Sequence, residues 1–333
     1  MRSIILKGLL LVLALNSCKK NTTDNTTVQD KQEESTIVTQ EVETSKPFFK
    51  LSLAQWSLNK AIRSGEMSPL DFAQKASELG FEGIEYVSQL YREELKKDTD
   101  PQVAMQKLLT TLKSNSETHN IQNLIIMVDG EGDLAGIDEE ERNQAVENHK
   151  KWVDAAQFLG CHSIRVNLFG ATDPEQWVTV ATDGLSKLSD YAATKNVNVI
   201  VENHGYLSSN AALLVEVMQK VNKPNCGTLP DFGNFCLERE NGERWGAKCV
   251  KEYPKYQGVE EMMPYAKAVS AKSYDFDAEG NETTIDYKRM LDIIKKSGYE
   301  GFIGVEYEGE RLGEMEGITA TRDLLSNIAK ELN

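Results

Sequence analysis

The sequence predicts an α/β protein in the form of a (β/α)8 barrel, with one folded domain spanning residues 47–333. Two patterns support this prediction. Eight short apolar segments alternate with amphipathic segments along that region, and such alternation folds into right-handed βαβ units around a parallel sheet. The region also has the length of one barrel, which typically takes about 250 residues as a single domain.

Each apolar segment has the length of a parallel strand that is buried on both faces. The predicted strands cover residues 50–56, 83–87, 123–128, 163–168, 198–202, 227–230, 268–273 and 301–306. A doubly wound open sheet is the alternative arrangement. However, no Gly-x-Gly-x-x-Gly motif follows the first strand, so the dinucleotide-binding form of that sheet is not indicated.

The segments between the strands carry residues that typically begin and end helices. The predicted helices cover residues 69–79, 101–115, 138–159, 174–195, 208–221, 285–297 and 319–332. Ser68 precedes a proline at the start of the first helix, which is favourable capping chemistry. Gly80, Gly160 and Gly298 stand at helix ends, where glycine readily adopts the required left-handed conformation.

One connection departs from this pattern. Residues 234–265 have little helical period and include several Lys, Glu and Tyr. A long loop after a strand lies on the active face of a barrel and often forms a lid; a plain insertion is the alternative. Cys236 and Cys249 fall in this segment, and whether they form a disulfide is left open. Cys161 and Cys226 stand at strand starts and are predicted to be small buried residues.

The first residues are predicted to be a lipoprotein signal. Arg2 and Lys7 precede an apolar stretch that is too short to span a bilayer. A small residue followed by Cys18 resembles a bacterial lipobox, so residues 1–17 would be removed and Cys18 would carry the lipid. An ordinary signal peptide is the alternative. Residues 18–46 are polar and predict a flexible tether. We therefore expect an exported lipoprotein of the cell envelope that meets the membrane only through this anchor.

The net charge of −15 makes nucleic acid an unexpected partner. An acidic surface repels phosphate backbones, and no basic cluster offsets it.

Carboxylates recur where predicted strands end. Glu202, Asp231, Asp275 and Glu306 each follow or close an apolar run in the second half of the chain. In parallel α/β folds, ligands bind at the carboxyl ends of the strands. These carboxylates therefore predict a shared site.

Four segments resemble the xylose isomerase-like TIM-barrel superfamily, which includes sugar-phosphate isomerases, epimerases and endonuclease IV. They are Val-Glu-Asn-His-Gly (201–205), Pro-Asp-Phe-Gly-Asn (230–234), Val-Ser-Ala-Lys (269–272) and Ser-Gly-Tyr-Glu-Gly-Phe-Ile-Gly-Val-Glu-Tyr-Glu-Gly (297–309). In sugar epimerases of that family, Glu, Asp, His and Glu on strands five to eight hold a divalent metal. The resemblance places Glu202, Asp231, Ser270 and Glu306 at those positions.

The family's histidine on strand seven is replaced here by Ser270. Three carboxylates with water suit Mg²⁺, Mn²⁺ or Ca²⁺, whereas the loss of an imidazole disfavours Zn²⁺. In the alternative interpretation, Lys272 supplies the positive charge and no ion is bound. Some positive centre is needed in either case, because three neighbouring carboxylates repel one another strongly in a partly dry pocket.

The expected activity is isomerisation or epimerisation of a sugar or keto-sugar. Glu202 and Glu306 would move a proton between carbons next to a carbonyl, while a metal or Lys272 stabilises the enediolate oxygens. A structural role, in which these glutamates only pair with nearby Arg or Lys, is the alternative. Elimination or hydration by the same site, a non-catalytic carbohydrate-binding barrel and an endonuclease IV-like enzyme are the alternatives. The last conflicts with the acidic charge and the export signal.

Further side chains are predicted to line the cavity and bind the substrate: Arg165, Asn167, His204, Asn234, Lys272 and Trp56. As alternatives to substrate binding, Arg165 could form an internal ion pair with one of the carboxylates, and Trp56 could be part of the hydrophobic core. Asp129 and Glu131 follow the third strand and either reach the cavity or form a turn. His119, His149 and His162 are expected at the surface or in packing.

Overall fold

A computed structural model describes residues 47–243 and 245–332. The predicted signal (1–17), the lipid anchor Cys18 and the tether (18–46) lie outside the described residues. The described residues belong to one compact unit.

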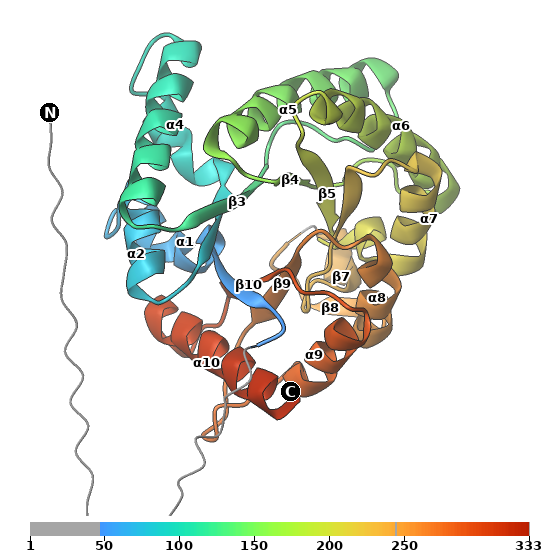
Figure 1. The fold of residues 1–333 in the computed structure, drawn as a ribbon. Helices are drawn as coiled ribbons and strands as arrows, with labels where there is room; N and C mark the ends of the chain where they lie inside the picture. The colour runs from blue at the N-terminus through green and yellow to red at the C-terminus, as the bar shows by residue number, and fades with distance from the viewer. Residues whose placement is uncertain (1–46, 244, 333) are drawn as a thin grey trace, which may run out of the picture. The chain divides into compact units, whose positions relative to one another are not determined.

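Eight parallel strands form the centre of the fold, with the order β6-β5-β4-β3-β2-β1-β10-β9 (Figure 1). They are β1 (Lys50–Ala54), β2 (Gly83–Val87), β3 (Gln122–Met127), β4 (Ser163–Val166), β5 (Asn198–Glu202), β6 (Cys226–Leu229), β9 (Val269–Ser273) and β10 (Phe302–Tyr307). Two parallel bridges, Thr228 to Ala266 and Asp231 to Ser270, join the outermost strands β6 and β9. The sheet therefore curls into a (β/α)8 barrel, which confirms the predicted fold class.

Helices surround the strands as an outer ring (Figure 1). They are α1 (Asn59–Ser64), α2 (Phe72–Glu78), α3 (Arg92–Leu95), α4 (Pro101–Thr118), α5 (Glu139–Leu159), α6 (Pro174–Ala193), α7 (Ala211–Val221), α8 (Lys255–Met262), α9 (Tyr287–Lys296) and α10 (Glu314–Leu332). All seven predicted helices are present within a few residues of their expected bounds. The sequence pattern missed α8, which lies inside the long connection, and the short helices α1 and α3.

Capping side chains at the helix starts explain why the helix boundaries could be predicted from the sequence. Ser68, Asp100, Asp138 and Asp173 each accept a backbone N–H of the first turn through their side chains. Gly160 ends α5 at φ +80°, where a side chain would be strained. The Ser, Asp and Gly residues that marked the helix boundaries in the sequence are thus the residues that cap the helices in the structure.

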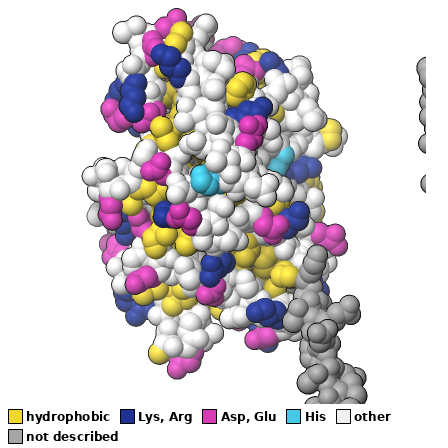
Figure 2. Space-filling model, turned by 60° about the vertical axis from the view of Figure 1, so that its left-hand side comes forward, with side chains coloured by type: hydrophobic (Ala, Val, Ile, Leu, Met, Phe, Trp, Pro, Cys, Tyr) yellow, Lys and Arg dark blue, Asp and Glu magenta, His cyan; other side chains and the backbone are white. Residues whose placement is uncertain are grey.

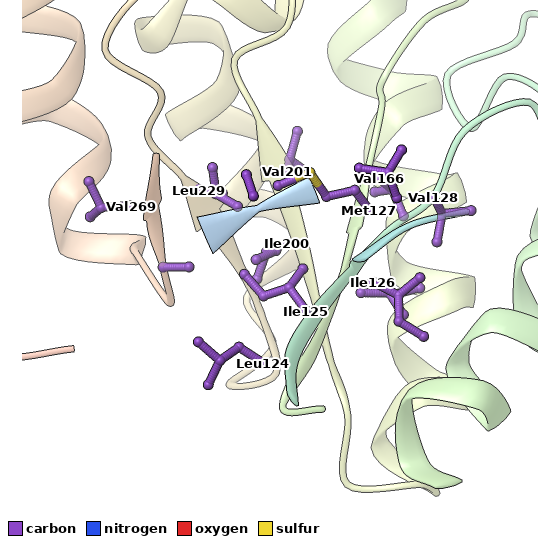
Figure 3. Close-up of a cluster of buried hydrophobic side chains, with 14 of the residues drawn as sticks. Leu124, Ile125, Ile126, Met127, Val128, Val166, Ile200, Val201, Leu229 and Val269 are labelled. Carbon is purple, nitrogen blue, oxygen red and sulfur yellow. The ribbon is translucent and has the colours of Figure 1, made fainter. Parts of the chain in front are cut away.

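The hydrophobic core lies inside the barrel and between the strands and helices. Figure 3 shows its part around β3, where Leu124, Ile125, Ile126, Met127 and Val128 are all buried. Consecutive residues of one strand point to opposite faces. An uninterrupted apolar run is therefore required where both faces are covered.

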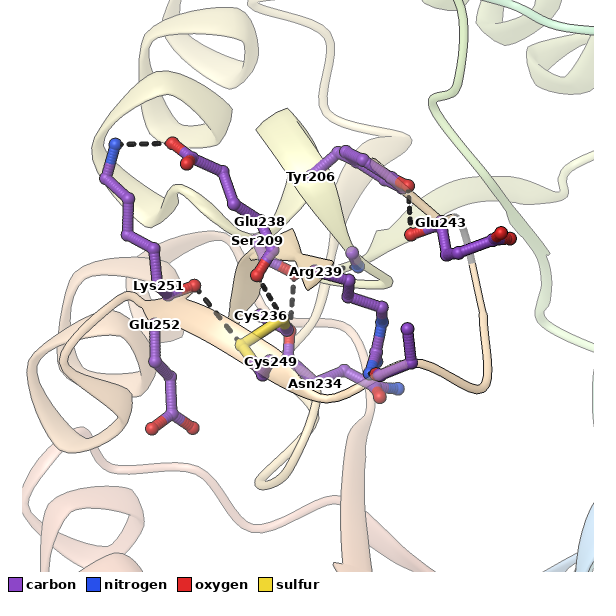
Figure 4. Close-up of a disulfide and its surroundings, with 12 residues drawn as sticks. Tyr206, Ser209, Asn234, Cys236, Glu238, Arg239, Glu243, Cys249, Lys251 and Glu252 are labelled. Atoms are coloured by element: carbon purple, nitrogen blue, oxygen red, sulfur yellow. Dashed lines mark hydrogen bonds and ion pairs between the residues drawn. A yellow bond between two sulfur atoms is a disulfide. The ribbon is translucent and has the colours of Figure 1, made fainter. Parts of the chain in front are cut away.

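A hairpin departs from the barrel within the long connection. Strands β7 (Cys236–Arg239) and β8 (Cys249–Glu252) pair antiparallel, and a disulfide joins Cys236 to Cys249 (Figure 4). The pairing that the sequence left open is therefore present. Cys161 and Cys226 are free and buried, as expected.

Acidic and basic side chains are interspersed on the face shown in Figure 2. Within the described residues, no helix combines the length and the hydropathy needed to cross a membrane.

Candidate active site

Three carboxylates converge at the carboxyl ends of their strands. Glu202 ends β5, Asp231 follows β6 and Glu306 lies on β10. One oxygen of each lies within 4.8 Å of the others, and all three side chains are buried. The residues come from segments up to about a hundred positions apart, and the parallel barrel brings them together because its strand ends share one rim.

Ser270, which the sequence resemblance places at the fourth metal position, lies between two of these carboxylates. Its Oγ is 2.6 Å from Asp231 Oδ2 and 3.1 Å from Glu306 Oε2. The hydroxyl thus ties β9 to both neighbouring strand ends.

Lys272 is the cation closest to Glu306 and is almost completely buried. Its Nζ lies 3.2 Å from Glu306 Oε1, 2.9 Å from Glu308 Oε1 and 3.8 Å from Asp231 Oδ2. A buried ammonium is costly unless it is paired. The three carboxylates supply that pairing, so Lys272 belongs to the charge balance of the site.

Arg165 neutralises the opposite side of the cluster. Its Nε lies 2.9 Å from Glu202 Oε2, and its Nη1 lies 3.1 Å from Asp129 Oδ1. The internal ion pair weighed as an alternative role for Arg165 is therefore present. It also brings Asp129 into the site, whereas Glu131 turns away to bond Trp152 and Lys151.

A chain of polar contacts extends from Asp129 to His204. Asn167 Nδ2 donates to Asp129 Oδ1 at 2.7 Å, and Asn167 Oδ1 lies 2.6 Å from His204 Nδ1. These contacts hold two of the predicted substrate ligands beside Glu202. Both side chains remain partly exposed, as a substrate contact requires.

The orientation of Asp231 is set by its neighbours. Its Oδ1 accepts the backbone N–H groups of Gly233 and Asn234, which leaves Oδ2 facing Ser270. Asn234 Nδ2 in turn donates to Glu202 Oε1 at 2.9 Å. Asn203, which the sequence did not single out, bonds the backbone of both Asp231 and Asn234.

Two other predicted positions lie outside this cluster. Asp275 pairs with Arg311. The Trp56 ring lies 4.6 Å below the guanidinium of Arg63 and packs partly against the core. The role of Trp56 in binding sugar therefore stays a prediction. His149 is buried and bonds the Ala145 carbonyl, as expected for a packing residue.

Burial and neighbouring charges give the three carboxylates different pKa values. Burial, reinforced by neighbouring carboxylates, raises the pKa of Glu306 to about 8 despite Lys272. Burial likewise raises the pKa of Asp231 to about 6. At Glu202 burial acts in the same direction, but His204, Arg165 and Lys272 outweigh it and lower the pKa. One carboxylate is thus ionised while another retains a proton.

These values indicate that the cluster lacks positive charge. Five carboxylates surround two cations: Asp129, Glu202, Asp231, Glu306 and Glu308 against Arg165 and Lys272. A divalent cation held by Glu202, Asp231 and Glu306 fits this donor set, since it would relieve the repulsion that now favours protonation. Three carboxylate oxygens are hard ligands.

Glu85 is a further buried carboxyl that the sequence analysis missed. It lies on β2 inside the barrel, where Ser52 Oγ donates to its Oε1 at 2.7 Å. Its Oε2 has no hydrogen-bond partner among the described residues. A Cβ at position 304 would stand 2.5 Å from this carboxyl, so the absence of a side chain at Gly304 makes room for the Glu85 carboxyl. A charged residue within an otherwise apolar strand was the available signal.

The titration of Glu85 predicts a pH-dependent stability. Burial raises the pKa of Glu85 to about 7 from the ordinary 4.5. The stability that the folded protein gains from the protonated carboxyl is therefore complete below pH 4.5 and is lost as the pH rises through 7. We compare the unfolding free energy of Glu85→Gln with that of wild type at two pH values. The difference should favour the variant by about 2–3 kcal/mol more at pH 8 than at pH 5. Urea unfolding at both values measures this, with the exposed Glu82→Gln as control. Parallel profiles for wild type and Glu85→Gln would contradict it.

Comparison with known proteins identifies the class. The sequence profile of the xylose isomerase-like TIM barrel family matches residues 73–330, and the chain belongs to this family. Solved structures agree on the fold. The IolI protein with a bound zinc atom superposes with a TM-score of 0.62 at 16% identity, covering 85% of this chain and 99% of that one. The 3-keto-D-glucoside 4-epimerase of E. coli gives 0.62 at 12% identity, covering 84% and 99%.

A family member from Mycobacterium smegmatis, in complex with magnesium, gives a TM-score of 0.57 at 14% identity and covers 86% of this chain and 99% of that one. Two of these structural neighbours thus contain a bound metal, zinc in one and magnesium in the other.

Two sequence relatives are enzymes that match over shorter segments. An inosose dehydratase of Geobacillus thermodenitrificans is 25% identical over 146 residues, which are 40% of this chain and 48% of that enzyme. The C-glycoside deglycosidase alpha subunit of Arthrobacter globiformis is 36% identical over 55 residues, 16% of each chain. The chain thus aligns with less than half of either relative.

Proposed function

We propose that this protein is a sugar isomerase or epimerase that moves a proton on a carbon next to the carbonyl of a keto-sugar. The observation that carries the proposal is the convergence of Glu202, Asp231 and Glu306 within 4.8 Å of one another, buried beside Lys272. Family membership supports the same class of reaction.

Glu202 and Glu306 are the groups proposed to transfer the proton. They stand on β5 and β10, three strands apart around the ring through β6 and β9, so they approach a substrate from different sides. Glu202 is held by Arg165 and Asn234 and would accept the proton. Glu306, on the neighbouring side of the cluster beside Lys272, would return one. Positioned proton transfer of this kind contributes about 10²–10⁴-fold to a rate.

Charge developing on the substrate oxygens also needs stabilisation. Lys272 and Arg165 hold their positive charge in a buried setting, where electrostatic stabilisation is stronger than in water. A divalent cation bound by Glu202, Asp231 and Glu306 would polarise the carbonyl oxygen as a Lewis acid. Mg²⁺, Mn²⁺ or Ca²⁺ suits this all-carboxylate set better than Zn²⁺.

Solvent deuterium exchange tests the proposal. The purified protein, with and without Mn²⁺, is incubated in D₂O with keto-hexoses and 3-keto-glucosides, and label at the carbon beside the carbonyl is followed by NMR. Enzyme-dependent label in at least one sugar is the expected result. Sugar binding by calorimetry without any exchange would instead support a non-catalytic carbohydrate-binding barrel.

Elimination is the second candidate reaction, and the names of the two sequence relatives favour it: a dehydratase and a deglycosidase. Once the proton is removed, loss of a group from the next carbon yields an unsaturated ketone instead of an epimer. Ultraviolet absorbance of that product in the same assay distinguishes the two outcomes.

We also propose that the protein is an exported lipoprotein of the cell envelope. The support is the sequence pattern of residues 1–17, the small residue before Cys18 and the polar composition of residues 18–46. Mass spectrometry of the N-terminal peptide from membrane fractions tests it; an unmodified Cys18 within an unprocessed chain would contradict it.

A further inference from the structure

A cavity of about 570 Å³ has mostly apolar walls. It lies between the segment that follows β4, the segment that follows β5 and the disulfide-bonded hairpin. Its walls include Leu168, Phe169, Trp177, Leu207, Leu213 and Leu237. The volume falls within the roughly 300–1,000 Å³ of small-molecule sites, which are mostly apolar and concave.

Aromatic side chains connect this cavity to the candidate active site. His204 stands two residues after Glu202, and its ring centre lies 6.2 Å from that of Phe169. Trp245, at the exposed tip of the hairpin, lies 4.9 Å from His204 and 5.8 Å from Phe169 between ring centres. Phe169 also lines the cavity. Phe169 therefore links the surroundings of His204 to the cavity.

Tyr206 shows that the wall of the cavity is held in a costly conformation. Its φ is +54°, which is uncommon for a bulky residue and is found mainly where surrounding structure enforces it. Its hydroxyl donates to the Glu243 carbonyl at 2.6 Å, which ties the wall to the hairpin (Figure 4). Such strain is concentrated at functional sites.

Several of the polar groups at the rim already have partners. Lys251 Nζ pairs with Glu238 Oε1 at 2.7 Å, and Asn210 Oδ1 accepts the Leu213 N–H. The indole N–H of Trp177 donates to the Leu168 carbonyl. A second sugar ring would have to bury its hydroxyls against largely apolar walls, whereas an aryl or alkyl group has no polar atom to leave without a hydrogen bond.

We propose that this cavity binds the apolar aglycone of a glycoside whose keto-sugar ring occupies the carboxylate cluster. The inference rests on the proposed function and narrows its substrate class to glycosides with an aryl or alkyl aglycone. Burying a phenyl group in such a cavity is expected to raise affinity about tenfold or more over a methyl group.

Calorimetry on the full-length protein with phenyl and methyl 3-keto-glucosides tests this. Wild type should bind the phenyl compound about tenfold more tightly. Leu237→Trp, which fills part of the cavity from β7, should reduce this preference to about twofold or less. Val250→Trp on β8 is the matched control, because Val250 is exposed and does not line the cavity; its preference should remain that of wild type.

The outcomes separate this inference from the proposed reaction. Equal binding of the two glycosides, an undiminished preference in Leu237→Trp or tighter binding of a 3-keto-disaccharide would each overturn the cavity assignment. Phenyl-selective binding that Leu237→Trp abolishes, without deuterium exchange, would uphold the cavity and count against the proton-transfer function alone.

Discussion

Replacing Glu306 with glutamine is expected to lower the rate of deuterium exchange into the keto-sugar by at least about 10²-fold. Glutamine keeps the shape of the side chain and can still accept from Ser270, but it can neither take nor return a proton. The carboxylate lies between Ser270 Oγ at 3.1 Å and Lys272 Nζ at 3.2 Å. The loss should therefore fall on the catalytic rate more than on KM. NMR under saturating sugar measures it.

Glu310→Gln is the matched control for this variant. Glu310 follows four residues later in the same segment and is exposed, so its variant should exchange at the wild-type rate. Glu202→Gln should behave like Glu306→Gln, because both carboxylates are needed for a two-sided transfer. If Glu306→Gln exchanges as fast as Glu310→Gln, the assignment of Glu306 is wrong.

Replacing Lys272 with methionine is expected to lower the unfolding free energy by about 3–5 kcal/mol at pH 8, the usual cost of removing one partner from a buried ion pair. Glu306 and Glu308 lose their nearest cation, and Asp231 loses a more distant one. Without Lys272 the pKa of the buried Glu306 rises further, so the lost stability grows as the pH increases. The deficit should therefore be smaller at pH 5 than at pH 8.

Urea unfolding in the presence of a chelator measures this effect. Lys267→Met serves as the control, since Lys267 is exposed just before β9 and should change stability by less than about 0.5 kcal/mol. Equal stability of the two variants at pH 8 would show that Lys272 does not balance the buried carboxylates. Such a result would also remove the lysine from the proposed stabilisation of substrate charge.

The strands and the strand-end carboxylates were predictable because they depend on local patterns. Apolar runs such as 123–128 are required where both faces of a strand are buried, and a carboxylate at the end of a run, as at Glu202, marks the rim of a parallel sheet. The long connection was also visible as a break in this rhythm. Helix α8 inside it was not, because it is short and its first residues have no capping side chain.

Part of the site depended on contacts that no local pattern reports. Asp129 stands in a Gly-Asp-rich stretch that reads as a turn, yet Arg165 and Asn167 draw it into the cluster. Glu85 lies in an otherwise apolar strand, and its burial depends on the space beside Gly304 and on the hydrogen bond from Ser52. Trp245 lies in an irregular segment whose position is set by the disulfide and by Tyr206.

The sequence by itself determined the class of fold, the order of strands and helices, and which carboxylates stand at strand ends, since these follow from short-range periodicity and capping chemistry. The tertiary structure decided which charged and polar groups of the site pair with one another. Pairing between Lys272 and Glu306, between Arg165 and Glu202, and between Ser270 and Asp231 joins residues at least 34 positions apart. Their distances arise only when the barrel closes, and the burial that shifts each pKa arises with them.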